Sequence, residues 1–224
     1  MAFDSFTLAA STAVLADEPH ARDHADMVEF RMDLASDPLA QLADYDGELP
    51  ILATNRVAWE GGEADDDDAR LDALETAVEY DTVAAIDLEL ECLLSGAGRR
   101  TAEHARERDV AVVASIHDFE ATPSEVRMRE LLEQATDRAD VGKLAVTATS
   151  RSDVLDLLSV TNLLTERGRT VATMAMGEMG RHSRAVAPIY GSKIGYGPLD
   201  SADATAPGQY DLATLSRLVR ELRG

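Results

Sequence analysis

Eight short runs of apolar and β-branched residues recur along this 224-residue chain, and polar segments with helical spacing separate most of them. The runs lie at Phe6–Ala10, Met27–Met32, Pro50–Asn55, Val83–Leu90, Val110–Ser115, Val141–Val146, Val171–Met176 and Ser192–Tyr196. Helices are expected at Asp67–Tyr80, Ser124–Ala139, Ser150–Arg167 and Tyr210–Arg223. Strands that alternate with helices form parallel sheets. Eight strands at a mean spacing of about 28 residues predict the α/β class and a (β/α)8 barrel.

No Gly/Ser-rich linker and no change in composition divides the chain. Residues 1–224 are therefore predicted to form a single barrel domain. A doubly wound open sheet would show the same alternation of strands and helices, and counting strands does not exclude it.

The charge of the chain limits its partners. Forty-two acidic residues against twenty-one lysines and arginines give a formal charge of −21. This charge repels phosphate backbones and anionic lipids, so neither nucleic acid nor a membrane is an expected partner. Only two of the basic residues are lysines, and an acidic surface with so few lysines is typical of adaptation to high salt. The single cysteine, Cys92, allows no internal disulfide, which together with the lack of a leader or apolar span indicates the cytoplasm.

Lys143 lies within the apolar run Val141–Val146. Burial disfavours the ammonium form of lysine, and a neutral amine attacks carbonyl carbon, the first step of Schiff-base catalysis. A lysine at a strand end can also extend its head to solvent as a purely structural residue. Because arginine serves almost everywhere else in this chain, chemistry is the favoured interpretation. Arg31, Arg56 and Arg184 are expected nearby, where their charge would further favour the neutral amine.

His117 follows the next strand upstream and is the candidate proton shuttle, because histidine titrates near neutrality. His104 and His182 are expected on the surface, as are His20 and His24. The last two are four residues apart, like a pair of metal ligands, but no third ligand accompanies them. No metal site is predicted.

Further polar residues at strand ends suit a small acidic substrate. Arg184 can grip a carboxylate, and Glu29 can accept hydrogen bonds from hydroxyls, although Glu29 and Arg31 could instead form a structural ion pair. Thr205 and Gln209 flank a turn that fits a lid or a hydroxyl-binding loop. No glycine-rich phosphate loop precedes a helix. A hydroxylated keto-carboxylate is therefore the expected substrate.

Taken in order, these motifs resemble the type I 3-dehydroquinate dehydratases over nearly the whole chain. They are Glu29-Phe30-Arg31, Arg56, Glu60–Glu63, Ile86–Glu89, Ser115–Phe119, Lys143–Val146, Met174–Gly177, Ser183-Arg184 and Ala206–Gln209. The resemblance implies a (β/α)8 barrel of the shikimate pathway of aromatic amino-acid biosynthesis, commonly a homodimer, with no metal or cofactor. The compact chain and its acidic composition are most similar to members from salt-loving archaea.

The resemblance also implies three catalytic residues. Lys143 would form an imine with the C3 ketone of 3-dehydroquinate. His117 would take a proton from C2 and return one to the departing C1 hydroxyl, giving 3-dehydroshikimate and water. Glu60 would orient His117 or tune its pKa.

Six residues are implied to bind substrate: Glu29, Arg31, Arg56, Arg184, Thr205 and Gln209. Arg184 would bind the carboxylate, with Arg181 as the alternative. In some members a serine near the first strand touches the substrate, and Ser11 is close to that position without a clear match.

Two other functions remain open at this stage. One is another imine-forming barrel, such as a class I aldolase acting on a phosphorylated sugar, which would need a phosphate-binding loop near the last strand. The other is a barrel that only binds a small acid. The pairing of Lys143 with His117 favours elimination over both.

Overall fold

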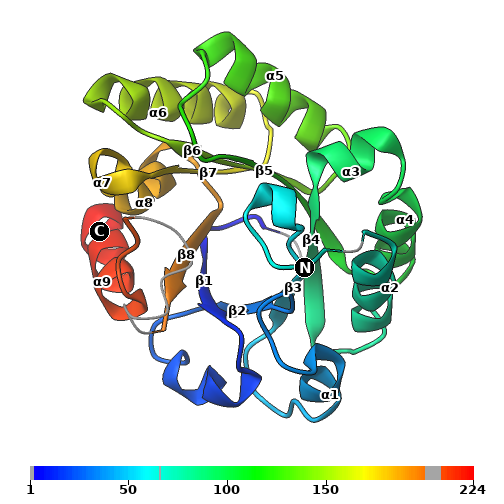
Figure 1. Ribbon diagram of the computed structural model, residues 1–224. Coiled ribbons are helices and arrows are strands. Elements are labelled where there is room, and N and C mark those ends of the chain that lie inside the picture. The colour runs from blue at the N-terminus through cyan, green and yellow to red at the C-terminus, as the bar shows by residue number, and fades with distance from the viewer. Residues whose placement is uncertain (1–2, 66, 200–207) are drawn as a thin grey trace.

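The computed structural model describes residues 3–65, 67–199 and 208–224, and these form a barrel of parallel strands surrounded by helices (Figure 1). The strands are β1 (Thr7–Thr12), β2 (Met27–Arg31), β3 (Ile51–Thr54), β4 (Val83–Glu89), β5 (Ala111–Asp118), β6 (Val141–Thr147), β7 (Val171–Met176) and β8 (Ile194–Pro198). Neighbours in the sheet follow the order of the chain, and β8 lies beside β1. The predicted (β/α)8 barrel is confirmed. A doubly wound sheet is excluded, because its strand order would reverse at a switch point.

The barrel closes between β7 and β8 with the help of a side chain. The backbone N–H of Lys193 donates to Val171 O at 2.8 Å. Beside it, the hydroxyl of Ser192 accepts from the backbone N–H of Thr173 at 2.9 Å. A buried serine thus satisfies a strand N–H at the seam.

Helices cover the outside of the barrel. They are α1 (Pro38–Ala43), α2 (Asp67–Ala77), α3 (Leu90–Ser95), α4 (Arg99–Glu107), α5 (Glu125–Thr136), α6 (Arg151–Glu166), α7 (Gly177–Gly180), α8 (Ser183–Val186) and α9 (Leu212–Arg223), with 3-10 turns η1 (Leu15–His20), η2 (Ala58–Glu60) and η3 (Ala187–Tyr190). Side-chain caps begin several of them. Ser150 and Asp153 form a capping box at α6, and Asp211 accepts from the N–H of Thr214 at α9. These caps satisfy N–H groups that the first turn leaves free. No helix in the described part of the chain is long and apolar enough to cross a membrane.

The inner face of the barrel is apolar at its N-terminal end and polar at its C-terminal end. Met27, Leu52, Val113, Val141 and Ile194 belong to one buried cluster inside the barrel, and Phe3 joins the same cluster. Side chains two residues apart on a strand share a face. The next inward positions are therefore Glu29, Thr54, Ser115, Lys143 and Tyr196. This period places the polar residues of several strands in one chamber.

The negative charge of the molecule predicts that salt stabilises it. At a formal charge of −21, like charges repel within the folded state, and salt screens this repulsion. We expect the melting temperature to rise by about 10 °C or more between low and molar potassium chloride, because each kcal/mol shifts it by about 2–4 °C in a chain of this size. Calorimetry across a salt series measures this, and equal melting temperatures would contradict it.

Candidate active site

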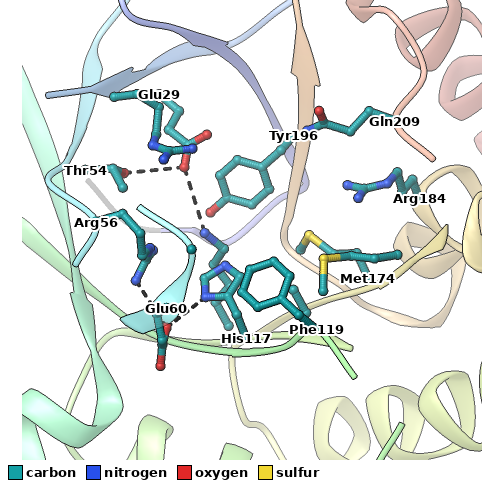
Figure 2. Close-up of a pocket in the computed structure, with 15 residues that line it drawn as sticks. Glu29, Thr54, Arg56, Glu60, His117, Phe119, Met174, Arg184, Tyr196 and Gln209 are labelled. Atoms are coloured by element: carbon teal, nitrogen blue, oxygen red, sulfur yellow. Dashed lines mark hydrogen bonds and ion pairs between the residues drawn. The ribbon is translucent and has the colours of Figure 1, made fainter. Parts of the chain in front are cut away.

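A cavity opens at the C-terminal end of the barrel, and eight of the nine residues singled out in the sequence line it (Figure 2). They are Glu29, Arg31, Arg56, Glu60, His117, Lys143, Arg184 and Gln209. The ninth, Thr205, lies outside the described residues. The remaining lining residues were given no role from sequence: Thr54, Gly61, Phe119, Ala145, Met174, Met176 and Tyr196.

Lys143 stands at the floor of this cavity. It is 4% exposed, so its head does not reach solvent as the structural interpretation would require. The Nζ atom lies 3.1 Å from Oδ2 of Asp87 and 3.8 Å from Oε1 of Glu29. The expected arginines line the same cavity, but the two charges nearest to the amine are carboxylates from β4 and β2.

Asp87 connects Lys143 to Arg56. Its Oδ1 accepts from Nη2 of Arg56 at 2.8 Å and from the hydroxyl of Ser115 at 2.6 Å. Burial alone would raise the pKa of Asp87, but Arg56, Lys143 and the Ser115 hydroxyl together hold it below its ordinary value. Asp87 is therefore an anion that faces the amine.

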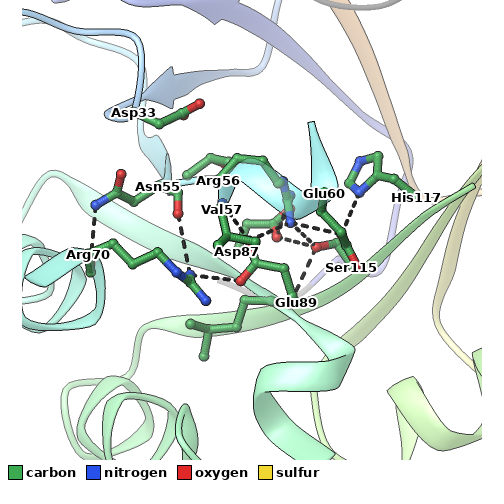
Figure 3. A network of polar contacts seen from close by, with 12 residues as sticks. Asp33, Asn55, Arg56, Val57, Glu60, Arg70, Asp87, Glu89, Ser115 and His117 are labelled. Atoms are coloured by element: carbon green, nitrogen blue, oxygen red, sulfur yellow. Dashed lines mark hydrogen bonds and ion pairs between the residues drawn. The ribbon is translucent and has the colours of Figure 1, made fainter. Parts of the chain in front are cut away.

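Arg56 is bound on several sides by buried groups (Figure 3). Besides Asp87, its Nη1 lies 3.0 Å from Oε1 of Glu89 and 3.5 Å from Oε2 of Glu60. The second oxygen of Glu89 lies 2.8 Å from Nη1 of Arg70, which comes from α2. Most of the donors of Arg56 are thus engaged by the protein, which indicates that Arg56 organises the wall of the cavity.

Glu60 and His117 form a pair. The 3-10 turn η2 carries Glu60 over the cavity, and its Oε2 lies 2.8 Å from Nδ1 of His117. Burial raises the pKa of Glu60 to about 8, against the opposing effect of Arg56. Burial, Arg56 and Lys143 lower the pKa of His117 well below its ordinary value. Because the two groups are in contact, their titrations are coupled.

Phe119 packs beside this pair. Its ring is stacked with that of His117, with centroids 5.9 Å apart and an interplanar angle of 12°. Gly61 has φ +79°, and a Cβ there would lie 2.5 Å from the Phe119 ring. Glycine is needed at this position both for its backbone conformation and for the close approach of Phe119.

Arg184 is a buried cation whose described surroundings leave two of its nitrogens without a partner. It is 5% exposed, and neither Nε nor Nη2 meets a hydrogen-bond acceptor among the described residues. Burial lowers its pKa to about 10. Arg181 is the alternative carboxylate ligand. Its Cζ atom instead lies over the Tyr210 ring, 4.2 Å from the ring centroid. The geometry favours Arg184 over Arg181 as the residue that binds an anionic group.

The alternative in which Glu29 and Arg31 form a structural ion pair with each other is wrong, because each has another partner. Arg31 forms a bidentate ion pair with Asp33, in which Nε donates to Oδ1 at 2.9 Å and Nη2 donates to Oδ2 at 2.6 Å. The sequence did not predict this role of Asp33. Glu29 accepts from the hydroxyl of Ser11 at 2.5 Å, so Ser11 supports Glu29 and is not among the lining residues. Glu29 and Arg31 therefore both line the cavity with separate supports.

No group of three or more His, Cys, Asp or Glu side chains is placed to hold a metal ion within residues 3–65, 67–199 and 208–224.

The chain is similar to known proteins over its whole length. The chain is 59% identical to a 3-dehydroquinate dehydratase of Haloarcula marismortui, covering 100% of this chain and 99% of the relative. It is 52% identical to the 3-dehydroquinate dehydratase of Halobacterium salinarum over the full length of both. Among solved structures, the 3-dehydroquinate dehydratase of Geobacillus kaustophilus superposes with a TM-score of 0.85 at 26% identity, over 98% of this chain and 92% of that one. The sequence pattern of the type I 3-dehydroquinases matches residues 5–224, and the chain belongs to this family.

Proposed function

We propose that this protein is a 3-dehydroquinate dehydratase that works through a Schiff base on Lys143 and serves the shikimate pathway. The observation that carries the proposal is a buried lysine in one cavity with the Glu60–His117 pair and with Arg184, two of whose nitrogens meet no acceptor among the described residues. Family membership over residues 5–224 supports the same substrate and reaction. It also weighs against the two alternatives, the aldolase-type barrel and the barrel that only binds an acid.

Substrate binding begins with the carboxylate. Arg184 supplies a buried guanidinium that forms charge-assisted hydrogen bonds with it. Glu29, Arg31 and Gln209 line the rest of the cavity and receive the ring hydroxyls. This orientation brings the C3 ketone to Lys143 and the C2 hydrogen to His117.

The reaction then runs through an imine. The Lys143 amine adds to C3, and loss of water leaves a C=N bond, which becomes cationic on protonation. Asp87 and Glu29 lie next to this nitrogen and stabilise its positive charge. The cation withdraws electrons from C2, so its proton becomes acidic. The electron pair released at C2 forms the C1–C2 double bond as the C1 hydroxyl departs, and water then releases 3-dehydroshikimate and the free amine.

His117 moves the proton in this sequence. Glu60 holds Nδ1, which leaves Nε2 to take the C2 proton and deliver it to the departing hydroxyl. Glu60 thereby fixes the tautomer of the imidazole and stabilises its charged form. In this scheme His117 serves as both the base and the acid of the elimination.

We further propose that the chain acts as one domain, without a metal or cofactor, in the cytoplasm and as a homodimer. Large apolar side chains exposed on neighbouring elements support a dimer: Leu155 on α6, Met179 on α7 and Ile189 on η3. Light scattering coupled to size-exclusion chromatography in molar salt tests the oligomeric state.

A direct assay tests the proposed activity. The purified protein in molar salt is mixed with 3-dehydroquinate, and the absorbance of the conjugated product is followed. We expect steady formation of 3-dehydroshikimate with untreated protein and with protein dialysed against a chelator. No product under any salt condition would refute the proposal.

Replacing Arg184 with alanine is expected to raise KM about 10- to 100-fold with a smaller effect on kcat, because two charge-assisted hydrogen bonds to the carboxylate are lost. Steady-state kinetics measures both constants, and Arg181→Ala serves as the comparison. A larger effect from Arg181→Ala than from Arg184→Ala would reverse the assignment.

Replacing Glu60 with glutamine is expected to move the acidic limb of the pH–kcat/KM profile to lower pH. Burial raises the pKa of Glu60 to about 8, so below that pH its carboxyl binds a proton and donates it to Nδ1 of His117, which leaves the imidazole hydrogen on Nε2, the nitrogen needed as a base. Glutamine removes the carboxylate whose pKa is raised, and His117 alone stays neutral to much lower pH because its own pKa is depressed. The variant should be slower at its optimum but retain its activity in acid. An unchanged limb would show that this pair does not set it.

A further inference from the structure

The hydroxyl of Tyr196 is a second polar group in the cavity that has no partner among the described residues. Tyr196 lies on β8, is 4% exposed, and its Oη is buried without a hydrogen bond to any part of the described chain. Figure 2 shows the hydroxyl directed into the cavity, toward the side of Glu29 and His117 and away from Arg184. The Tyr196 hydroxyl therefore faces a part of the bound substrate other than the carboxylate that Arg184 binds.

An unpartnered hydroxyl in a buried position destabilises the protein. Phenylalanine would fill the same space without this cost. Two other tyrosines do have acceptors, since Tyr45 donates to Leu49 O at 2.7 Å and Tyr80 donates to Leu39 O at 3.4 Å. The Tyr196 hydroxyl is thus placed to meet a ligand.

The position of Tyr196 specifies which part of the ligand it meets. The Nζ atom of Lys143 lies 4.4 Å from the centroid of the Tyr196 ring, and the cation is held over the ring face. Any carbon that bonds to Nζ therefore lies close to the tyrosine. On that carbon the substrate carries its ketone oxygen, which becomes a hydroxyl when the amine adds.

The surroundings keep the phenol protonated. Burial, with the negative charges of Glu29 and Asp87, raises the pKa of Tyr196 well above its ordinary value, and Arg56 only partly opposes this. The other titratable side chains that line the cavity are Arg31, Glu60, His117, Lys143 and Arg184. A phenol that stays neutral can donate a hydrogen bond but cannot act as a base.

We propose that Tyr196 is a further catalytic residue, whose hydroxyl donates a hydrogen bond to the oxygen on the carbon that Lys143 attacks. As the amine forms its bond to carbon, the π electrons of the carbonyl move to this oxygen, which takes up one proton from the nitrogen and becomes the hydroxyl of the carbinolamine. His117 carries the second proton of the nitrogen to that hydroxyl, which leaves as water while the nitrogen electron pair forms the C=N bond. Tyr196 keeps its own proton throughout and stabilises the developing charge on oxygen. The inference rests on the proposed function.

Tyr196→Phe tests this role, since it removes one oxygen and keeps the ring under Lys143. Protein and excess 3-dehydroquinate are mixed rapidly, quenched with borohydride at set times, and weighed by mass spectrometry to follow imine formation. We expect imine formation about 10- to 100-fold slower than in the unaltered protein, with little change in KM. Tyr45→Phe is the matched control, because it removes a bonded hydroxyl away from the cavity and should leave the rate unchanged.

Three outcomes would overturn the inference. Imine formation at the normal rate in Tyr196→Phe removes the role at this oxygen. A raised KM with normal imine formation places the hydroxyl on another part of the substrate. If the unaltered protein forms no adduct, the proposed function is contradicted and the inference with it. If both proteins form the adduct at equal rates, only the role of Tyr196 is contradicted.

Discussion

Replacing Lys143 with alanine is expected to abolish turnover of 3-dehydroquinate, with kcat lowered by about 10⁵-fold or more. The amine supplies the covalent link that turns the ketone into a cationic imine, and an attached nucleophile is equivalent to a very high local concentration of amine. Without it, His117 would have to remove a proton from beside an unactivated ketone. Steady-state assays with high enzyme concentrations measure the residual rate.

Two further variants make this result specific. Lys143→Arg keeps a positive charge beside Asp87 and Glu29 but cannot form the imine, so it should be as inactive as the alanine variant. Lys193→Ala removes the other lysine, which donates to the backbone of Asp4, and should retain activity. Circular dichroism confirms that each variant is folded. Turnover within tenfold of normal in Lys143→Ala would rule out the imine pathway.

Replacing His117 with glutamine is expected to lower kcat by about 10²- to 10⁴-fold, which is the usual contribution of a positioned acid–base group. Glutamine can keep a hydrogen bond to Glu60 but cannot take the C2 proton. Because Lys143 remains, the imine should still form and accumulate before the elimination step. The measurement combines steady-state kinetics with the fraction of protein trapped by borohydride during turnover.

His104→Gln provides the control for His117. His104 lies on α4 and contacts Glu79 at 2.7 Å on the surface, so its loss should not change kcat. A normal rate in His117→Gln would assign the proton transfer to another group. A slow rate with no accumulated imine would place His117 in imine formation instead of elimination.

The sequence predicted the architecture because the strand pattern and the positions of polar residues describe the same geometry. Each predicted strand lies within a few residues of the observed one, and the observed β5 runs on to include His117. Residues two apart on a strand point to the same face, and this spacing places Glu29, Arg31 and Lys143 on the inner face of the barrel. The carboxyl ends of parallel strands meet at one rim, so residues far apart in sequence could be expected in a single cavity.

What the sequence did not predict are the partners that hold these residues. Asp33 binds Arg31, and Asp87 faces Lys143, because of side-chain directions that depend on the twist and register of several strands. The aromatic lining was missed for a different reason. Tyr196 and Phe119 resemble ordinary core residues in the sequence, and only the three-dimensional structure shows that the buried Tyr196 hydroxyl has no partner among residues 3–65, 67–199 and 208–224.

The environment of the lysine is the most informative of these differences. From sequence, cations were expected to keep the amine neutral. The structure places two carboxylates beside it, an arrangement better suited to stabilising a cationic imine once it has formed.

Reductive trapping gives the sharpest test of an imine on Lys143. The protein is incubated with 3-dehydroquinate, treated with borohydride, digested, and the peptides are weighed and sequenced by mass spectrometry. We expect one adduct, equal in mass to the ligand less one oxygen atom, on the peptide that carries Lys143, and none in Lys143→Ala. Formation of 3-dehydroshikimate without any adduct, or an adduct on Lys193, would contradict it.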